Sequence, residues 1–169
     1  MNQEILRKNE ITFKGSFLTL VGPKLEVGQQ ALNFSLISTD MQEVTLDDFK
    51  GKELIITTVP SIDTPVCDLQ AKRFNDEAKK HPNLEVILVS CDTPFAQARW
   101  LKESSCINVR LLSDYKEHFF GKNYGLLIDE LKLLTRAVII IGKDQKIKYV
   151  QIVEEVTLQP NYEDVLKHI

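Results

Sequence analysis

Cys67 is the residue with the clearest capacity for chemistry, because of the elements that the sequence predicts on either side of it. The preceding run, residues 54–59, is apolar or β-branched and carries no charge, which predicts a buried strand. Pro60 ends this run, since proline cannot donate a hydrogen bond to a sheet ladder. After Cys67, apolar residues recur at roughly helical spacing. A cysteine in the first turn of a helix meets unpaired N–H groups and the positive end of the helix dipole, and both favour the reactive thiolate.

The composition of the chain limits the kinds of protein it could be. Its 169 residues, 43% of them hydrophobic, suffice for one well-buried domain and are few for two, so we expect a single domain over residues 1–169. A net charge of -3 gives no electrostatic case for binding nucleic acid or an anionic membrane. The chain shows no transmembrane run and no secretory signal. We therefore expect a cytoplasmic protein with neither nucleic acid nor membrane as a partner.

The cysteines and histidines argue against a disulfide framework and against a metal centre. Cys67, Cys91 and Cys106 are odd in number and form no C-x-x-C pair, a pattern that suits a reducing compartment. No cysteine or histidine shares a short metal-binding spacing with another. The scattered histidines are His81, His118 and His168. We expect neither a metal nor a cofactor.

The rest of the chain reads as an α/β arrangement of alternating strands and helices. A hairpin is predicted at about residues 10–21 and a second one at residues 134–141 and 146–153. The other predicted strands cover residues 33–38, 41–44, 84–90 and 109–112. Helices are predicted after Cys67 to about residue 81, from residue 94 to about 104, at residues 114–120 with a break at Gly121, and from Asn161 onward. Hairpins are antiparallel and strand–helix–strand crossovers are parallel, so the sheet should be mixed.

The segment Pro60–Cys67 has the form P-x-x-x-T-x-x-C, and further short motifs follow in order along nearly the whole chain. They are Phe13-Lys14-Gly15, Leu20-Val21-Gly22, Lys72-Arg73-Phe74-Asn75, Asp92-Thr93-Pro94-Phe95-Ala96-Gln97, Arg136-Ala137-Val138 and Glu154-Glu155-Val156. Together they resemble the bacterial thiol peroxidase branch of the peroxiredoxin family, the atypical two-cysteine type. The resemblance implies a thioredoxin-like three-layer sandwich with a mixed central sheet, to which the N-terminal hairpin is an addition.

The resemblance also implies an activity, a thiol-dependent reduction of hydrogen peroxide and organic hydroperoxides. A thiolate attacks the distal peroxide oxygen and becomes a sulfenic acid, here at Cys67, which thioredoxin or another thiol donor reduces again. Carried over by motif, Thr64, Arg136 and the backbone N–H of Cys67 would polarise the peroxide, while Pro60 would shield the site from water. The family further implies a homodimer without a prosthetic group.

The chain departs from the family at the second cysteine. The family usually carries a resolving cysteine in the form R-[F/W]-C, and the matching stretch here is Arg99-Trp100-Leu101. On a continuing helix, Cys106 would point roughly 140° away from that position. A helix that ends near residues 104–105 would instead leave Cys106 in a loop that could reach Cys67 by local unfolding. Cys106 is our candidate for the resolving cysteine, with Cys91 or an external thiol as the alternatives.

Three rival interpretations of Cys67 stay open at this point. Many free cysteines are simply small buried apolar residues. A thioredoxin-fold module could also use Cys67 only as a redox sensor, oxidising once and waiting for a partner. Finally, Cys67–Arg73 matches the bare C-x5-R pattern of cysteine phosphatases. That chemistry needs a loop that cradles phosphate, however, and this segment has no glycine and favours helix.

Overall fold

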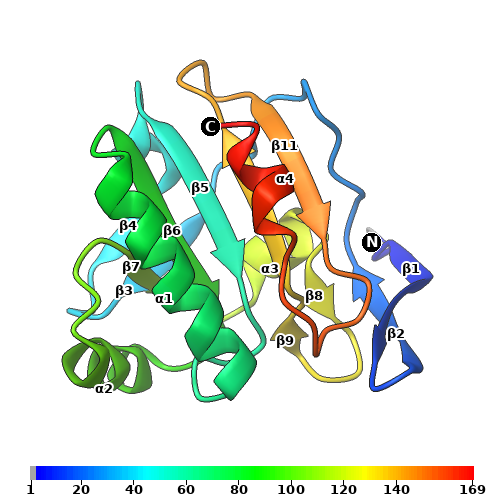
Figure 1. The fold of residues 1–169 in the computed structure, drawn as a ribbon. Helices are drawn as coiled ribbons and strands as arrows, with labels where there is room; N and C mark the ends of the chain where they lie inside the picture. Colours follow the sequence, from blue (N-terminus) through cyan, green and yellow to red (C-terminus); the bar gives the residue numbers. More distant parts are fainter. Residues whose placement is uncertain (1–2) are drawn as a thin grey trace.

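The computed structural model describes residues 3–169 and builds them around a seven-stranded mixed sheet (Figure 1). The strands of this sheet are β3 (Ser35–Ser38), β4 (Glu43–Thr45), β5 (Glu53–Thr58), β6 (Leu84–Ser90), β7 (Arg110–Ser113), β10 (Ala137–Ile141) and β11 (Ile147–Ile152). Their order is β11-β10-β5-β6-β7-β3-β4. Strands β5, β6 and β7 are parallel, and the remaining neighbours pair antiparallel. The predicted mixed sheet is confirmed.

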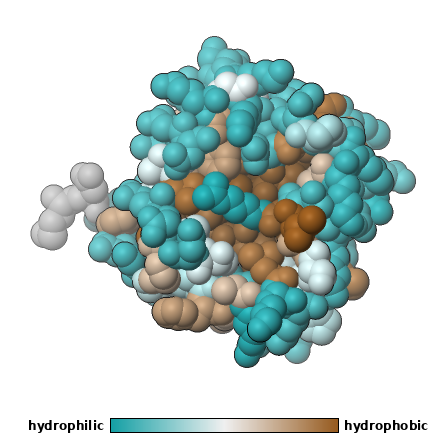
Figure 2. Space-filling model, turned by 90° about the vertical axis from the view of Figure 1, so that its left-hand side faces the viewer, coloured by the Kyte–Doolittle hydropathy of each residue, from teal (hydrophilic) through white to brown (hydrophobic). Residues whose placement is uncertain are grey.

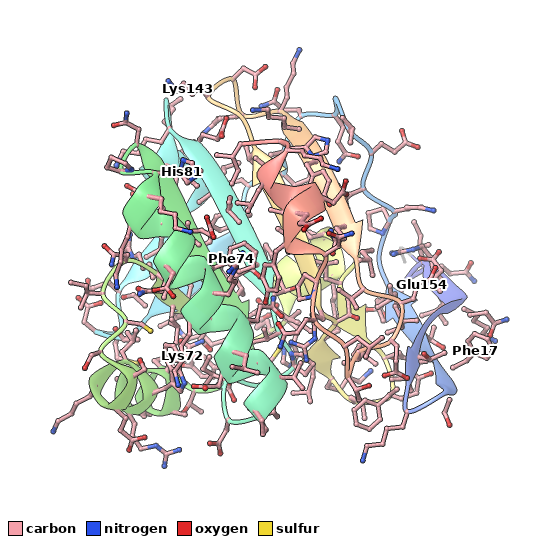
Figure 3. The ribbon with its side chains drawn as sticks, viewed as in Figure 1. Phe17, Lys72, Phe74, His81, Lys143 and Glu154 are labelled. Atoms are coloured by element: carbon pink, nitrogen blue, oxygen red, sulfur yellow. The ribbon has the colours of Figure 1, made fainter. Side chains whose placement is uncertain are left out.

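Helices lie on both faces of this sheet and make the outer two layers. One face is covered by α1 (Pro65–Lys80) and α4 (Tyr162–Leu166), with α2 (Pro94–Ser104) beside β7 at one end (Figure 1). Phe74 of α1 points toward α4, where its ring centroid lies 5.5 Å from that of Tyr162 (Figure 3). The other face carries the short helix α3 (Phe119–Asn123) and the 3₁₀ turn η1 (Leu46–Phe49).

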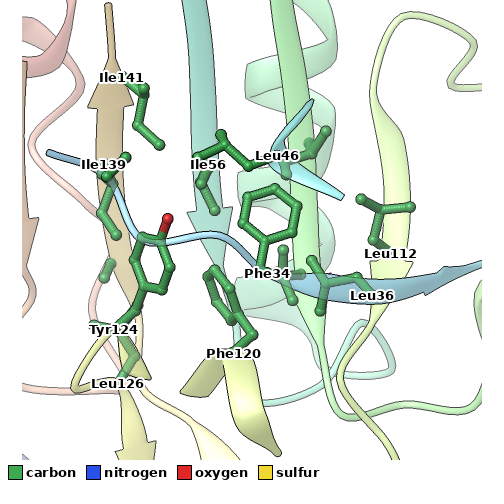
Figure 4. Close-up of a cluster of buried hydrophobic side chains, with 14 of the residues drawn as sticks. Phe34, Leu36, Leu46, Ile56, Leu112, Phe120, Tyr124, Leu126, Ile139 and Ile141 are labelled. Atoms are coloured by element: carbon green, nitrogen blue, oxygen red, sulfur yellow. The ribbon is translucent and has the colours of Figure 1, made fainter. Parts of the chain in front are cut away.

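The central strand β5 is apolar because both of its faces are buried. Ile55 belongs to the cluster under α1, whereas Leu54 and Ile56 belong to the cluster on the opposite face. That second cluster is centred on aromatic side chains (Figure 4). The rings of Phe34 and Phe120 meet edge to face at 5.8 Å, and Phe120 stacks on Tyr124 at 4.7 Å. Because β5 is buried on both faces, a charged side chain in it would have no access to water, which explains the uncharged run.

A second, smaller sheet contains the N-terminal hairpin. Its strands are β1 (Leu6–Phe13), β2 (Ser16–Val21), β8 (Leu127–Ile128) and β9 (Leu133–Leu134), in the order β1-β2-β8-β9. The predicted hairpin is confirmed, with β1 beginning earlier than expected and Gly15 supplying a positive φ of 83° at the turn. Beyond its own sheet, the hairpin pairs with the segment after β11. The N–H of Thr12 donates to Glu154 O, and the N–H of Val156 donates to Thr12 O at 2.9 Å.

The helix predicted at residues 114–120 is wrong. Residues 115–117 form a turn, His118 has a left-handed φ of 57°, and α3 begins only at Phe119. The cause is Asp114, whose buried carboxylate accepts the N–H groups of Phe120 at 3.2 Å and of Gly121 at 2.8 Å. Gly121 lies inside α3, at a position where a Cβ would come within 2.7 Å of the Leu134 side chain. The glycine is required by close packing and does not break the helix.

The other predicted elements agree with the structure to within a few residues. Thr64 and Thr93 cap α1 and α2, each followed by a proline at the start of the helix. Helix α2 ends at Ser104, and Ser105 takes a left-handed φ of 58° as its C-cap. Asn161 caps α4. Among the residues that the structure describes, no helix combines the length and apolar character needed to cross a membrane.

Candidate active site

Cys67 lies in the first turn of α1, as predicted, and its side chain is fully buried. The loop from Val59 to Thr64 connects it to the carboxyl end of β5. The Thr64 hydroxyl oxygen accepts the N–H of Cys67 at 3.3 Å and donates to Ser61 O at 3.3 Å. Pro60 is half-buried at the start of this loop. The sequence therefore placed the thiol and its helix cap correctly from local signals alone.

Sheet pairing brings Arg136 to Cys67 from a distant part of the sequence. Arg136 directly precedes β10, and β10 pairs antiparallel with β5 so that Ala137 lies opposite Thr58. The residue before β10 consequently lies where β5 leads into the Cys67 loop. Arg136 is 2% exposed, and its Nη2 donates to Cys67 Sγ at 3.4 Å. Of the predicted polarising groups, Thr64, Arg136 and the Cys67 backbone do come together.

Two acceptors that the sequence analysis missed hold the guanidinium of Arg136 in place. Its Nη1 donates to Gln70 Oε1 at 2.7 Å, and its Nε donates to Val156 O at 2.8 Å. Gln70 is itself fully buried, and its Nε2 donates to Thr57 Oγ1 at 2.5 Å. A buried guanidinium needs such partners, because an unpaired one costs several kcal/mol. Helical spacing from Cys67 could have identified Gln70, since i and i+3 share a face of a helix.

The side chain of Asp92 holds the loop before Cys67 in place. Asp92 begins the family motif Asp92–Gln97 and directly precedes Thr93, the cap of α2. The Ser61 hydroxyl donates to Asp92 Oδ1 and the N–H of Ile62 donates to Asp92 Oδ2, both at 2.7 Å. Ser90 Oγ donates to the same carboxylate at 2.7 Å. This carboxylate fixes the polar corner that connects β5 to α1.

The arrangement suits attack by sulfur on a polar bond. A charged Arg136 donor on the sulfur and the N-terminal end of α1 both stabilise negative charge at Cys67. The same donors can stabilise charge on a leaving oxygen, and they are already oriented before any substrate arrives. Burial makes these interactions stronger than they would be in water.

The remaining thiols lie in two different environments, and all three cysteines are free. Cys106 follows α2 and is buried in the same apolar cluster as Cys67. It also borders an open groove of about 760 Å³ that Leu101 lines as well. This groove is on the side of the molecule that carries α2 and β7, where apolar side chains gather in the middle of the face (Figure 2).

Cys91 is less suited to attack a sulfur. It lies at the end of β6, with its Sγ 3.3 Å from His118 Nδ1. Burial, reinforced by the carboxylates of Asp114 and Asp92, raises the pKa of the Cys91 thiol to about 12. A thiol with so high a pKa carries little thiolate at neutral pH.

The phosphatase interpretation does not fit the structure. Residues 65–80 form a continuous helix, so the segment Cys67–Arg73 makes no loop around a phosphate. Arg73 turns away from the sulfur, with its guanidinium 5.3 Å from the Tyr162 ring centroid and 3.5 Å from the Glu77 carboxylate.

Comparison with known proteins identifies the family. The Redoxin family model matches residues 26–166. The thiol peroxidase of Halalkalibacterium halodurans is 46% identical over 157 residues, which cover 93% of this chain and 95% of the relative. That of Bacillus subtilis (strain 168) is 46% identical over 154 residues, 91% and 92% of the two chains. The chain belongs to the redoxin family, in its thiol peroxidase branch.

Solved structures agree with membership of the redoxin family. The crystal structure of a peroxiredoxin-like protein from Aquifex aeolicus superimposes with a TM-score of 0.88 at 38% identity, covering 98% of this chain and 96% of that one. The thiol peroxidase from Chromobacterium violaceum superimposes with a TM-score of 0.84 at 22% identity, covering 93% of each chain, and supports the fold alone. The thioredoxin-like peroxiredoxin fold expected from the resemblance is confirmed.

Proposed function

We propose that Cys67 is the peroxide-reducing thiol of this thiol-dependent peroxidase and that Arg136 is its charge-stabilising partner. The observation that carries the proposal is the hydrogen bond of 3.4 Å from Arg136 Nη2 to Cys67 Sγ inside a buried site. Membership of the thiol peroxidase branch supplies the reaction class. Hydrogen peroxide and organic hydroperoxides are the proposed substrates.

The reaction at Cys67 begins with attack of the thiolate on the distal oxygen of the peroxide. A sulfur–oxygen bond forms as the oxygen–oxygen bond breaks, and the bonding pair leaves with the second oxygen, which takes up a proton as water or alcohol. Sulfur is oxidised to a sulfenic acid. Arg136 stabilises the departing oxygen, and the Thr64 hydroxyl can turn its proton from Ser61 O toward the peroxide. Pro60, at the start of the loop, helps to exclude water.

Cys106 is the proposed resolving thiol. Its sulfur would attack the sulfenic acid at Cys67, forming a disulfide and releasing water. Cys106 shares an apolar cluster with Cys67 and follows the left-handed cap of α2, where the helix has ended. In this proposal, Cys106 takes the role that the family usually gives to a resolving cysteine at the position occupied here by Leu101. Both thiols are buried, so the step requires local unwinding at the start of α1 or in the loop after α2.

Thioredoxin is the proposed reductant of the disulfide and a homodimer the proposed assembly, both following from the family. We further propose that residues 1–169 act as a single domain and that the compartment is a reducing cytoplasm, which suits three free thiols. Continuous peroxide consumption with thioredoxin and its reductase would distinguish this enzyme from a redox sensor, which turns over once. Light scattering measures the assembly.

The decisive experiment treats the reduced protein with one equivalent of peroxide and measures intact and peptide masses. We expect a loss of two hydrogens, with Cys67 linked to Cys106. The Cys106→Ser variant should stop at one added oxygen on Cys67, whereas Cys91→Ser should behave as the wild type. A Cys67→Ser variant that still consumed peroxide at the wild-type rate would overturn the assignment. A Cys67 sulfenic acid with both other thiols free in the wild type would replace Cys106 with an external thiol.

A further inference from the structure

Three side chains with metal-binding atoms meet away from the Cys67–Arg136 pair. They are Cys91, Asp114 and His118. Each offers one ligand atom, namely the sulfur, a carboxylate oxygen or a ring nitrogen. These three atoms lie within 4.8 Å of one another. The sequence concealed this cluster because Cys91 is far along the chain from the segment between β7 and α3 that holds the other two residues. Cys91 follows β6, Asp114 follows β7, and His118 precedes α3.

The parallel pairing of β6 with β7 places two of the three side by side. Ser90 lies opposite Ser113, so the next residues, Cys91 and Asp114, leave the same edge of the sheet together. The N–H of Asp114 also donates to Ser90 O at 2.9 Å, which fixes this register. The left-handed conformation of His118 then brings its Nδ1 to 3.3 Å from Cys91 Sγ.

We propose that Cys91, Asp114 and His118 bind one divalent transition-metal ion, with Zn²⁺ as the best chemical match. Thiolate, imidazole and carboxylate are the three ligand types that zinc takes in proteins. In a tetrahedral zinc site the sulfur and nitrogen ligands stand about 3.5 Å apart, from the usual bond lengths. The 3.3 Å between Cys91 Sγ and His118 Nδ1 is close to that spacing. A fourth position remains for water.

Asp114 is already oriented for such a role. It is 4% exposed, and each of its carboxylate oxygens accepts one backbone N–H from α3. A carboxylate oxygen has two lone pairs, so either one can also bind a metal. Hydrogen bonds of this kind hold ligands in place around protein metal centres. Softer ligands such as Cys91 also disfavour Mg²⁺ and Ca²⁺, which take oxygen ligands.

Binding requires no electron transfer. The Cys91 thiol loses its proton to solvent as the sulfur–metal bond forms, and the charges of the thiolate and the Asp114 carboxylate are balanced by the dication. The bound ion would tie the ends of β6 and β7 to α3. It would also remove Cys91 from thiol chemistry and leave Cys67 and Cys106 as the free pair. The site does not depend on the proposed peroxidase activity.

The test uses full-length, fully reduced, metal-free protein and two probes. Zn²⁺ is titrated in competition with a chromophoric chelator, and Co²⁺ is added to look for a thiolate-to-metal charge-transfer band. We expect one equivalent to bind, with affinity reduced at least about 10-fold in Cys91→Ser and in His118→Gln. The charge-transfer band should disappear in Cys91→Ser.

Matched variants separate this site from the other thiols and histidines. Cys67→Ser, Cys106→Ser and His81→Gln should each keep the full equivalent and the band. Binding that is lost in Cys67→Ser or Cys106→Ser and kept in Cys91→Ser would overturn the proposal. So would a wild-type protein that takes up no metal from the chelator. Asp114→Asn could disturb α3, so the thermal unfolding of this variant is compared with that of His118→Gln. Zn²⁺ should raise the melting temperature of neither variant.

Discussion

Gln70 accepts a hydrogen bond of 2.7 Å from Nη1 of Arg136, the guanidinium whose Nη2 donates to the Cys67 sulfur. The amide is itself held from the other side by Thr57 at the end of the central strand. The orientation of the Arg136 guanidinium therefore depends on β5, the strand that also leads into the Cys67 loop. We therefore propose Gln70 as a positioning residue, which acts on the Cys67 sulfur only through Arg136.

Gln70→Leu should slow the oxidation of Cys67 by peroxide roughly 10- to 100-fold, because a misplaced donor loses much of its effect. Rapid mixing with peroxide measures this rate directly. Asn75→Leu is the matched control, since Asn75 is also a buried amide side chain of α1, but it accepts the N–H of Asn108. Equal loss of rate in the two variants would reduce Gln70 to a general stabilising residue.

Arg136→Met should slow the same step by at least about 10-fold, as expected for removal of a charge-stabilising donor. Arg136→Lys should not restore it, since an ammonium cannot bond Gln70, Val156 and the sulfur in the same fork. Arg73→Met serves as control, because that side chain is about half exposed and turned away from the sulfur. An unchanged rate in Arg136→Met would mean that another group stabilises the leaving oxygen.

Leu101→Cys should restore an internal disulfide to a variant that lacks Cys106. In Cys106→Ser the sulfenic acid at Cys67 has no proposed partner within the chain, whereas position 101 is where the family usually carries its resolving cysteine. Peptide mapping after one equivalent of peroxide should find Cys67 linked to the new thiol. Failure to form that link would show that the end of α2 does not open toward Cys67.

The pH dependence of stability should reveal the contact of Glu155 with the hairpin. Hydrogen bonds from Thr157 and from the N–H of Gly15 lower the pKa of Glu155 from 4.5 to about 2. Because the folded-state pKa is lowered, the stabilisation is complete above about pH 4.5 and is lost as the pH falls toward 2.

Urea unfolding of the wild type and Glu155→Gln between pH 2 and 7 measures this dependence. The two curves should differ at neutral pH and approach each other as the pH falls from about 4.5 toward 2. Glu154→Gln, an exposed neighbour, should follow the wild type throughout. A constant difference between wild type and Glu155→Gln at all pH values would show that ionisation of Glu155 plays no part.

The strand and helix around Cys67 could be predicted because their signals are local. An uncharged β-branched run, a proline stop and a threonine cap act within a few residues of the bonds they determine. Helix α3 could not, since its beginning depends on the buried Asp114 carboxylate and its glycine on packing against Leu134. The arginine was chosen by resemblance, and only the pairing of β10 with β5 explains why it is the right distance from the sulfur.

The backbone of Val156 has two neighbours with different roles. Its carbonyl accepts from Arg136 Nε, and its N–H donates to Thr12 of the N-terminal hairpin. The N-terminal hairpin, an addition to the three-layer sandwich, is thus joined through Val156 to the guanidinium of Arg136. A change in the hairpin that displaces Thr12 would therefore act on Arg136 as well as on the stability of the fold. Thermal stability alone would report only the second of these effects.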